Sequence, residues 1–158
     1  MNARPPSPAA RIAESLSRFP PAIVALTKKC LPKLGRALPG TTQLVYDYSH
    51  SLVVAFGMSE RGHEAIVALA AGPREVRLYV DKSTPDPKGL LEGTGRKVRS
   101  VVLEAASDLD RAEIEALIRG AIELSGVTLP KGRPNRIVIK SAAKKKKQKP
   151  RPKRTRRA

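Results

Sequence analysis

The chain has 158 residues, which is enough for one domain with a single hydrophobic core. Its formal net charge is +17, from 31 Lys and Arg against 14 Asp and Glu. Residues 131–158 hold 14 of the basic residues and no acidic one, which leaves a net charge of only +3 for residues 1–130. The sequence therefore separates a nearly neutral globular part from a strongly basic end.

Several protein classes are excluded by what the composition lacks. The single cysteine, Cys30, excludes an intramolecular disulfide and a zinc site made of several cysteines. No apolar run approaches the roughly 18 residues that a membrane-spanning helix needs. Residues 1–10 also lack the apolar core of a signal peptide. We therefore expect a cytoplasmic protein without a membrane span.

The N-terminal part of the chain predicts two helices. Residues 1–10 are rich in proline and are expected to be disordered, so we expect the folded domain to span residues 11–140. Apolar residues then recur at helical spacing, first at Ile12, Leu16 and Phe19, and after Pro20-Pro21 at Ile23, Leu26, Cys30 and Leu34. The opposite face of the second helix carries Lys28, Lys29, Lys33 and Arg36. Pro32 lies inside this second helix and predicts a kink or an early break.

The middle of the chain predicts strands of an antiparallel sheet. Apolar and polar residues alternate over residues 43–48 and 76–80, whereas residues 52–56 and 65–71 are apolar almost throughout. A loop with two prolines and three glycines covers residues 81–95, and β character resumes at residues 97–104. The short breaks between these runs are typical of a meander.

The last helix has the clearest predicted start. Asp110 is the expected N-cap, Glu113 completes a capping box, and Leu109 with Ile114 forms a hydrophobic staple. An apolar stripe follows up to Gly126, a natural helix stop, and residues 136–140 predict one more short edge strand. The order of elements predicts an α+β fold, an antiparallel sheet of about five strands with helices packed on one face.

Three stretches resemble a known family. They are Leu-Pro-Gly-Thr-Thr-Gln-Leu-Val-Tyr-Asp-Tyr at residues 38–48, the apolar run 52–56, and the loop at residues 86–99, followed by the capped helix. Together they resemble the YdhG-like domain family of bacteria over about residues 20–140. The resemblance implies an α+β fold and, for most members, no assigned activity. One branch is described as a frataxin-like iron chaperone, which implies an acidic surface, but the acids of this chain are few, scattered and offset by bases.

Two local patterns invite a binding function and have simpler interpretations. The glycines of the segment 89–97 resemble a phosphate-binding loop, but the spacing is wrong and the segment leads into a strand, which favours plain tight turns. A weak anion site around Arg96, Lys97 and Arg99 stays open. His50 and His63, with Asp47, Glu60 or Glu64, could bind a metal, but their spacing is that of solvated residues in turns, so no metal site or cofactor is predicted.

Aromatic residues of the predicted sheet are candidates for a ligand pocket. Tyr46, Tyr48, Phe56 and Tyr79 could line such a pocket between the sheet and the helices, or they could be ordinary core residues. Cys30 is predicted to be a small buried apolar residue and not a nucleophile. No spacing typical of catalytic residues is present, so no catalytic residue is predicted and a non-enzymatic protein is favoured.

The basic end of the chain predicts a nucleic-acid partner. Residues 141–158 contain no large apolar side chain and are expected to be a disordered tail. The predicted nucleic-acid-binding residues are Lys144, Lys145, Lys146, Lys147, Lys149, Arg151, Lys153, Arg154, Arg156 and Arg157. Lys and Arg at this density bind phosphates by counterion release, and without aromatic residues in the tail no sequence readout is expected.

The sequence thus favours a binding module whose tail binds DNA or RNA non-specifically. Two alternatives remain open at this point. One is a metal-handling protein like the frataxin-like branch of the family, and the other is a small-ligand-binding domain that uses the tyrosines. A solubilising tail, contact with an anionic membrane surface or a nuclear import signal would also account for the basic segment.

Overall fold

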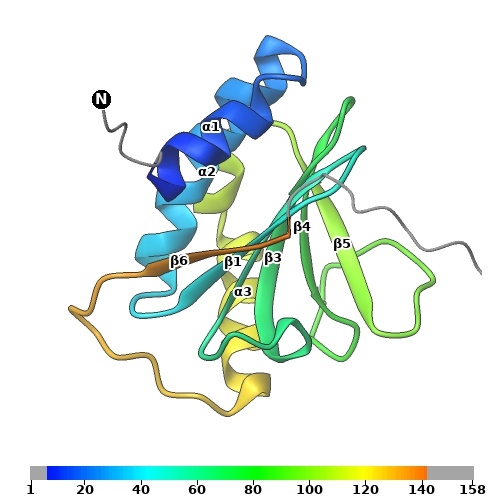
Figure 1. Ribbon diagram of the computed structural model, residues 1–158. Coiled ribbons are helices and arrows are strands. Elements are labelled where there is room, and N and C mark those ends of the chain that lie inside the picture. The colour runs from blue at the N-terminus through cyan, green and yellow to red at the C-terminus, as the bar shows by residue number, and fades with distance from the viewer. Residues whose placement is uncertain (1–6, 142–158) are drawn as a thin grey trace, which may run out of the picture.

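The computed structural model describes residues 7–141, which form an α+β domain with a six-stranded sheet and three α-helices (Figure 1). The basic segment 142–158 lies outside the described residues. Within residues 7–141, no helix is both long enough and apolar enough to cross a membrane. The elements are α1 (Pro8–Leu16), α2 (Pro21–Ala37), β1 (Thr42–Asp47), β2 (Leu52–Gly57), η1 (Gly62–Glu64), β3 (Ala65–Ala71), β4 (Val76–Asp81), β5 (Val98–Leu103), η2 (Ala106–Asp110), α3 (Ala112–Ser125) and β6 (Arg136–Ser141).

The sheet is mixed and not purely antiparallel, which corrects the prediction of about five antiparallel strands. Its order is β5-β4-β3-β2-β1-β6, and the first five strands form the predicted antiparallel meander. β6 pairs in parallel with β1 at the far edge of the sheet. The chain reaches this edge only after α3, and such a crossover connection is what a parallel strand pair requires.

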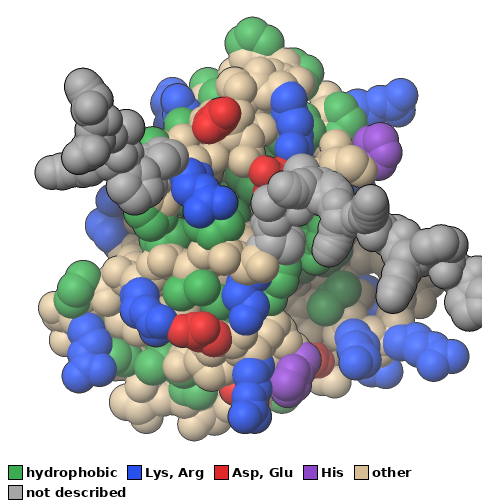
Figure 2. Space-filling view, in the orientation of Figure 1, with side chains coloured by type: hydrophobic (Ala, Val, Ile, Leu, Met, Phe, Trp, Pro, Cys, Tyr) green, Lys and Arg blue, Asp and Glu red, His purple; other side chains and the backbone are tan. Residues whose placement is uncertain are grey.

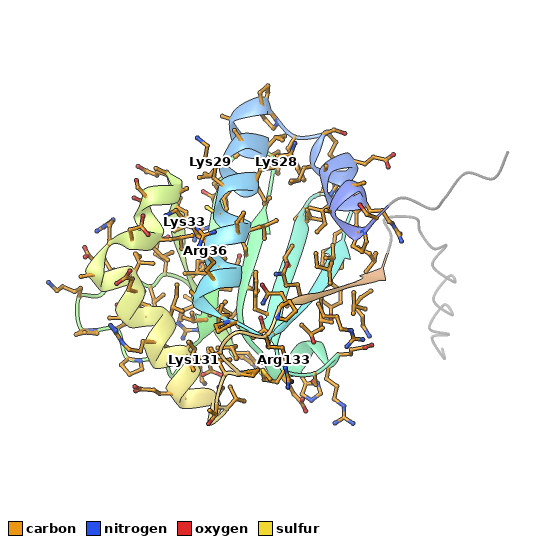
Figure 3. The ribbon with its side chains drawn as sticks, turned by 90° about the vertical axis from the view of Figure 1, so that its left-hand side faces the viewer. Lys28, Lys29, Lys33, Arg36, Lys131 and Arg133 are labelled. Atoms are coloured by element: carbon orange, nitrogen blue, oxygen red, sulfur yellow. The ribbon has the colours of Figure 1, made fainter. Side chains whose placement is uncertain are left out.

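The two faces of the sheet have different surroundings. Cross-strand partners Val54 and Leu69, and next to them Leu78, point to the face that α2 and α3 cover, and each is at most 1% exposed. Figure 3 shows α2 and α3 on one side of the strands, which confirms the prediction that helices pack on one face. The residues between them along each strand point to the opposite face, which none of the three described α-helices covers (Figure 3).

The first helix starts inside the segment 1–10 that the sequence predicts to be disordered. Ser7 is its N-cap, and the Ser7 hydroxyl accepts a hydrogen bond from the backbone N–H of Ala10 at 3.1 Å. Ile12 and Leu16 are buried in the core as their spacing predicts, and α1 lies beside α2 in Figure 1. Arg18, just after α1, donates to the Asp47 carboxylate at 2.7 Å and to the carbonyls of Tyr48 and Ser51.

The second helix runs through Pro32 without the predicted early break. Pro32 removes one backbone hydrogen bond to the carbonyl of Lys28, but both residues are exposed, so water can satisfy that carbonyl. Leu34 and Gly35, two and three residues further on, are buried against the rest of the domain. The free energy of that packing keeps the last turn helical.

The start of the third helix differs from the predicted capping box. α3 begins at Ala112 with Arg111 as N-cap, and no side chain caps it. The residue that shapes this corner is Asp108, whose carboxylate accepts hydrogen bonds from the backbone N–H groups of Glu104 and Ala105 before the short helix η2. Asp110 instead pairs with Lys33. The predicted stop at Gly126 is confirmed, since Gly126 ends the helix with a φ of 76°.

Candidate functional site

The ten predicted nucleic-acid-binding residues of segment 144–157 lie outside the described residues. The structure does place the point from which this segment continues. β6 ends at Ser141, where it pairs with Tyr46 of β1. The basic segment therefore starts at the sheet edge, close to one of the tyrosines that the sequence singles out.

Basic side chains lie along the length of α2, and two of them, Lys33 and Arg36, line the groove between α2 and α3 (Figure 3). This helix carries Lys28, Lys29, Lys33 and Arg36 and no acidic residue. Figure 3 shows Lys131 and Arg133 beyond the C-terminal end of the same helix, so bases from two distant parts of the sequence lie along one side of the molecule. We call the set Lys28, Lys29, Lys33, Arg36, Lys131 and Arg133 the α2 basic row.

Most of the α2 basic row has no neutralising partner among residues 7–141. Lys33 alone forms an ion pair there, with the Asp110 carboxylate at 2.7 Å. Asp110 and Glu115 line the groove of about 330 Å³ between α2 and α3, so the nearby acids lie on one flank of the row. The other basic side chains keep their full charge available to an anionic partner.

The three tyrosines of the predicted pocket share one face of the sheet, the face that the helices leave uncovered. The rings of Tyr46 and Tyr48 are stacked, with centroids 6.0 Å apart and planes 5° from parallel. Tyr79 lies on β4, three strands away from β1 in the sheet order. Phe56 is the exception, because it points to the helices and is fully buried in the core. Phe56 therefore does not share a pocket with the three tyrosines.

A trough crosses this uncovered face. One hollow of about 780 Å³ is lined by Tyr46, Tyr48, Tyr79 and the short side chains of Ala55 and Ala68. A second hollow of about 430 Å³ shares Val53, Ala68, Tyr79 and Val98 with the first, so the two lie side by side on this face. Figure 2 shows a recess right of centre on this face, with basic side chains beside it. The trough exists because alanines stand at the centre of the face and tyrosines at its sides.

Basic side chains from the loop before β5 reach the rim of the trough. Lys82, Arg96 and Lys97 line the larger hollow, and none of them forms an ion pair within residues 7–141. Two of the three residues of the weak anion site that the sequence left open, Arg96 and Lys97, therefore lie at the trough. Arg99 donates instead to the carbonyl of Val98 at 2.9 Å.

The glycine-containing segment 89–97 forms tight turns that are held by hydrogen bonds within the loop. The Asp86 carboxylate accepts hydrogen bonds from the backbone N–H groups of Leu90 and Leu91 at 2.8 and 2.9 Å. Gly89 and Gly93 have φ angles of 64° and 119°, which L side chains rarely adopt. Since a carboxylate of the protein already occupies these N–H groups, the geometry supports the interpretation as tight turns.

No group of three or more His, Cys, Asp or Glu side chains within residues 7–141 is arranged to hold a metal ion. His50 and His63 are both exposed in turns, and Asp47 is engaged by Arg18. Cys30 is fully buried, and this burial, reinforced by the nearby Asp108 carboxylate, raises the pKa of its thiol to about 11. The prediction that Cys30 is a buried apolar residue is confirmed.

The sequence analysis named the three tyrosines that line the trough, but it placed their pocket between the sheet and the helices. The signal was present as the alternation of tyrosine and alanine along the strands, but the face to which each residue points depends on strand pairing. No family model, curated protein or solved structure matches this chain. The resemblance to the YdhG-like family therefore stays a prediction that rests on the motifs quoted above.

Proposed function

We propose that this protein is a non-enzymatic module that binds nucleic acid without sequence preference, through the basic segment 144–157 and the α2 basic row. The observation that carries the proposal is the row itself, a helix with four basic residues and no acid, extended by Lys131 and Arg133. The proposal also includes a cytoplasmic location and membership of the YdhG-like family.

The dimensions of the row suit a polyanion. Lys28 and Arg36 are eight positions apart on α2, which corresponds to about 12 Å along a helix axis. Duplex DNA carries one negative charge for about every 1.7 Å of its axis, so that length faces about seven phosphates. Lys28, Lys29 and Arg36, the three basic side chains of α2 without an ion pair among residues 7–141, can each approach a different phosphate at this spacing.

The chemistry of these contacts explains why no sequence preference is proposed. Lys side chains are flexible point charges that bind phosphates without a fixed geometry. Contacts to phosphate fix the position of the protein but carry no information about the bases. The metal-handling alternative gains no support from the described residues, which hold no group of three or more potential metal ligands.

The proposal is tested on the full chain with charge-neutralised variants. One variant replaces the ten Lys and Arg of segment 144–157 with Gln, and a second carries Lys28→Gln, Lys29→Gln and Arg36→Gln. Fluorescence anisotropy with a labelled 20-nucleotide strand and with its duplex measures the affinity at low salt. We expect the affinity of the first variant to fall by at least about tenfold, and the affinity of the second variant to fall by a smaller factor.

A matched control separates position from charge. The variant Arg11→Gln, Arg74→Gln and Lys88→Gln removes the same number of charges from exposed positions outside the α2 basic row. We expect it to weaken binding less than the α2 variant does. Absence of binding by the unmodified chain at low salt, or equal affinities for all variants, would overturn the proposal.

A further inference from the structure

The aromatic residues of this chain are sorted between the two faces of the sheet. All three tyrosines lie on the uncovered face, in or beside the trough. Both phenylalanines, Phe19 and Phe56, are buried in the core on the helix side. Tyr48 is 49% exposed, although it sits beside a strand whose other side chains are largely buried. The exposed aromatic surface of the domain is therefore concentrated at one place.

The spacing of the tyrosines leaves room for a flat ligand between them. Tyr46 lies on β1, Tyr48 follows directly after it, and Tyr79 lies on β4. Because β1 and β4 are three strand spacings apart, about 14 Å separates the two groups of rings. The floor between them is made of Ala55 and Ala68, so the rings stand above it as two walls. A planar base that enters the trough can stack on a ring at either wall.

The rim of the trough complements phosphate. Lys82, Arg96 and Lys97 border the larger hollow without ion-pair partners in residues 7–141, against one carboxylate, Asp81. That carboxylate accepts a hydrogen bond from the backbone N–H of Ser83 at 2.8 Å. The trough therefore combines aromatic walls with a net positive border, the two features of surfaces that bind single-stranded nucleic acids.

The trough also adjoins the point where the basic segment begins. Ser141 pairs with Tyr46, and the first lysine of the segment follows three residues later in the sequence. A strand held by the segment is thus kept at a high local concentration near the trough. The bases of a duplex are already stacked on one another, whereas those of a single strand are free to stack on tyrosine.

We propose that the trough is a single-strand binding site, in which unpaired bases of DNA or RNA stack on Tyr48, Tyr46 and Tyr79 while Lys82, Arg96 and Lys97 contact the phosphates. This inference rests on the proposed function, because it names the form of nucleic acid that the module prefers. It adds a second contact mode, stacking, which segment 144–157 cannot supply because it contains no aromatic residue.

Intrinsic tyrosine fluorescence tests the inference on the unmodified chain. The protein has no tryptophan, and its only tyrosines are those at the trough. Titration with a 12-nucleotide oligothymidylate is expected to quench this fluorescence, since a base stacked on a tyrosine ring takes up its excitation. A 12-base-pair duplex that binds at the same salt concentration is expected to leave the fluorescence nearly unchanged.

Matched variants of the full chain test the role of the rings. Tyr48→Leu with Tyr79→Leu removes stacking, whereas Tyr48→Phe with Tyr79→Phe keeps it. We expect the leucine pair to lower the affinity for the single strand by about tenfold or more and the affinity for the duplex by less than about twofold. The phenylalanine pair should bind both as the unmodified chain does.

Two outcomes would overturn the inference while the proposed function stands. One is binding of the single strand without quenching, and the other is an equal loss for single strand and duplex in the leucine pair. Thymidine monophosphate is a free aromatic anion. If it quenched the fluorescence with the same affinity as the oligonucleotide does, the trough would be a small-molecule site and the inference would also be overturned. Absence of binding to either nucleic acid would instead contradict the proposed function.

Discussion

Gly40 and Pro130 lie in direct contact, although 90 residues separate them in the sequence. A Cβ on Gly40 would stand 2.3 Å from the Cγ of Pro130, closer than any real contact of such atoms. Gly40 precedes β1, and Pro130 precedes β6. This contact therefore holds together the two segments that lead into the parallel strands β1 and β6, next to the α2 basic row.

Gly40→Ala is expected to destabilise the domain by at least about 2 kcal/mol, since the φ of 75° is unfavourable for alanine and the new methyl group would overlap Pro130. Gly126→Ala is the matched control, because Gly126 has nearly the same φ of 76° and nothing within 4 Å of its added Cβ. Urea unfolding should show a clearly larger loss for the first variant. Equal losses would mean that the contact with Pro130 contributes nothing.

Phe56→Ala is expected to cost about 3–5 kcal/mol, because Phe56 is fully buried among the core residues. Tyr79→Ala removes a side chain of similar size from the trough and should cost only about 1–2 kcal/mol. Chemical unfolding of both variants measures the difference. A loss for Tyr79→Ala as large as that for Phe56→Ala would show that the uncovered face is also packed.

The strands could be predicted almost residue by residue, because local alternation and Gly or Pro breaks define them. The predicted runs 52–56 and 65–71 correspond to β2 and β3 within one residue. The face to which Phe56 points could not be predicted, since its strand is apolar on both sides. Likewise the segment 136–140 reads as a strand, but its parallel pairing with β1 depends on a crossover that local sequence does not encode.

Side-chain partners across the fold explain the remaining errors. The sequence predicts Asp110 as the cap of the last helix, and only the position of Lys33 on another helix decides that Asp110 forms an ion pair instead. That the tyrosines gather on the face away from the helices was not predicted for a similar reason. The walls of the trough come from β1 and β4, and three strand pairings have to be known before Tyr46 and Tyr79 face the same space.

Cys30 predicts a stability change at alkaline pH. Burial raises the pKa of its thiol from 9.0 to about 11, so the folded state holds the proton more tightly than the unfolded state does. The stabilisation is complete below pH 9 and is lost as the pH rises towards 11. Relative to Cys30→Ala, the free energy of unfolding of the unmodified chain should fall by about 2 kcal/mol across this range.

Thermal or urea unfolding of both proteins at several pH values between 8 and 11 measures this difference, and the alanine variant removes the contribution of all other titrating groups. A constant difference between the two proteins over the whole range would show that the thiol ionises as freely in the folded state as in the unfolded one.

The salt dependence of binding tests the central claim most directly. Each phosphate contact contributes a slope of about −0.7 to a plot of log affinity against log salt concentration on a single strand. With bases of segment 144–157 and of the α2 basic row engaged, the full chain should give a slope steeper than about −4, and neutralising the segment should flatten it by several units. A slope near zero for the full chain would contradict binding through these bases. The same slope for the full chain and for the variant with a neutralised segment would also contradict it.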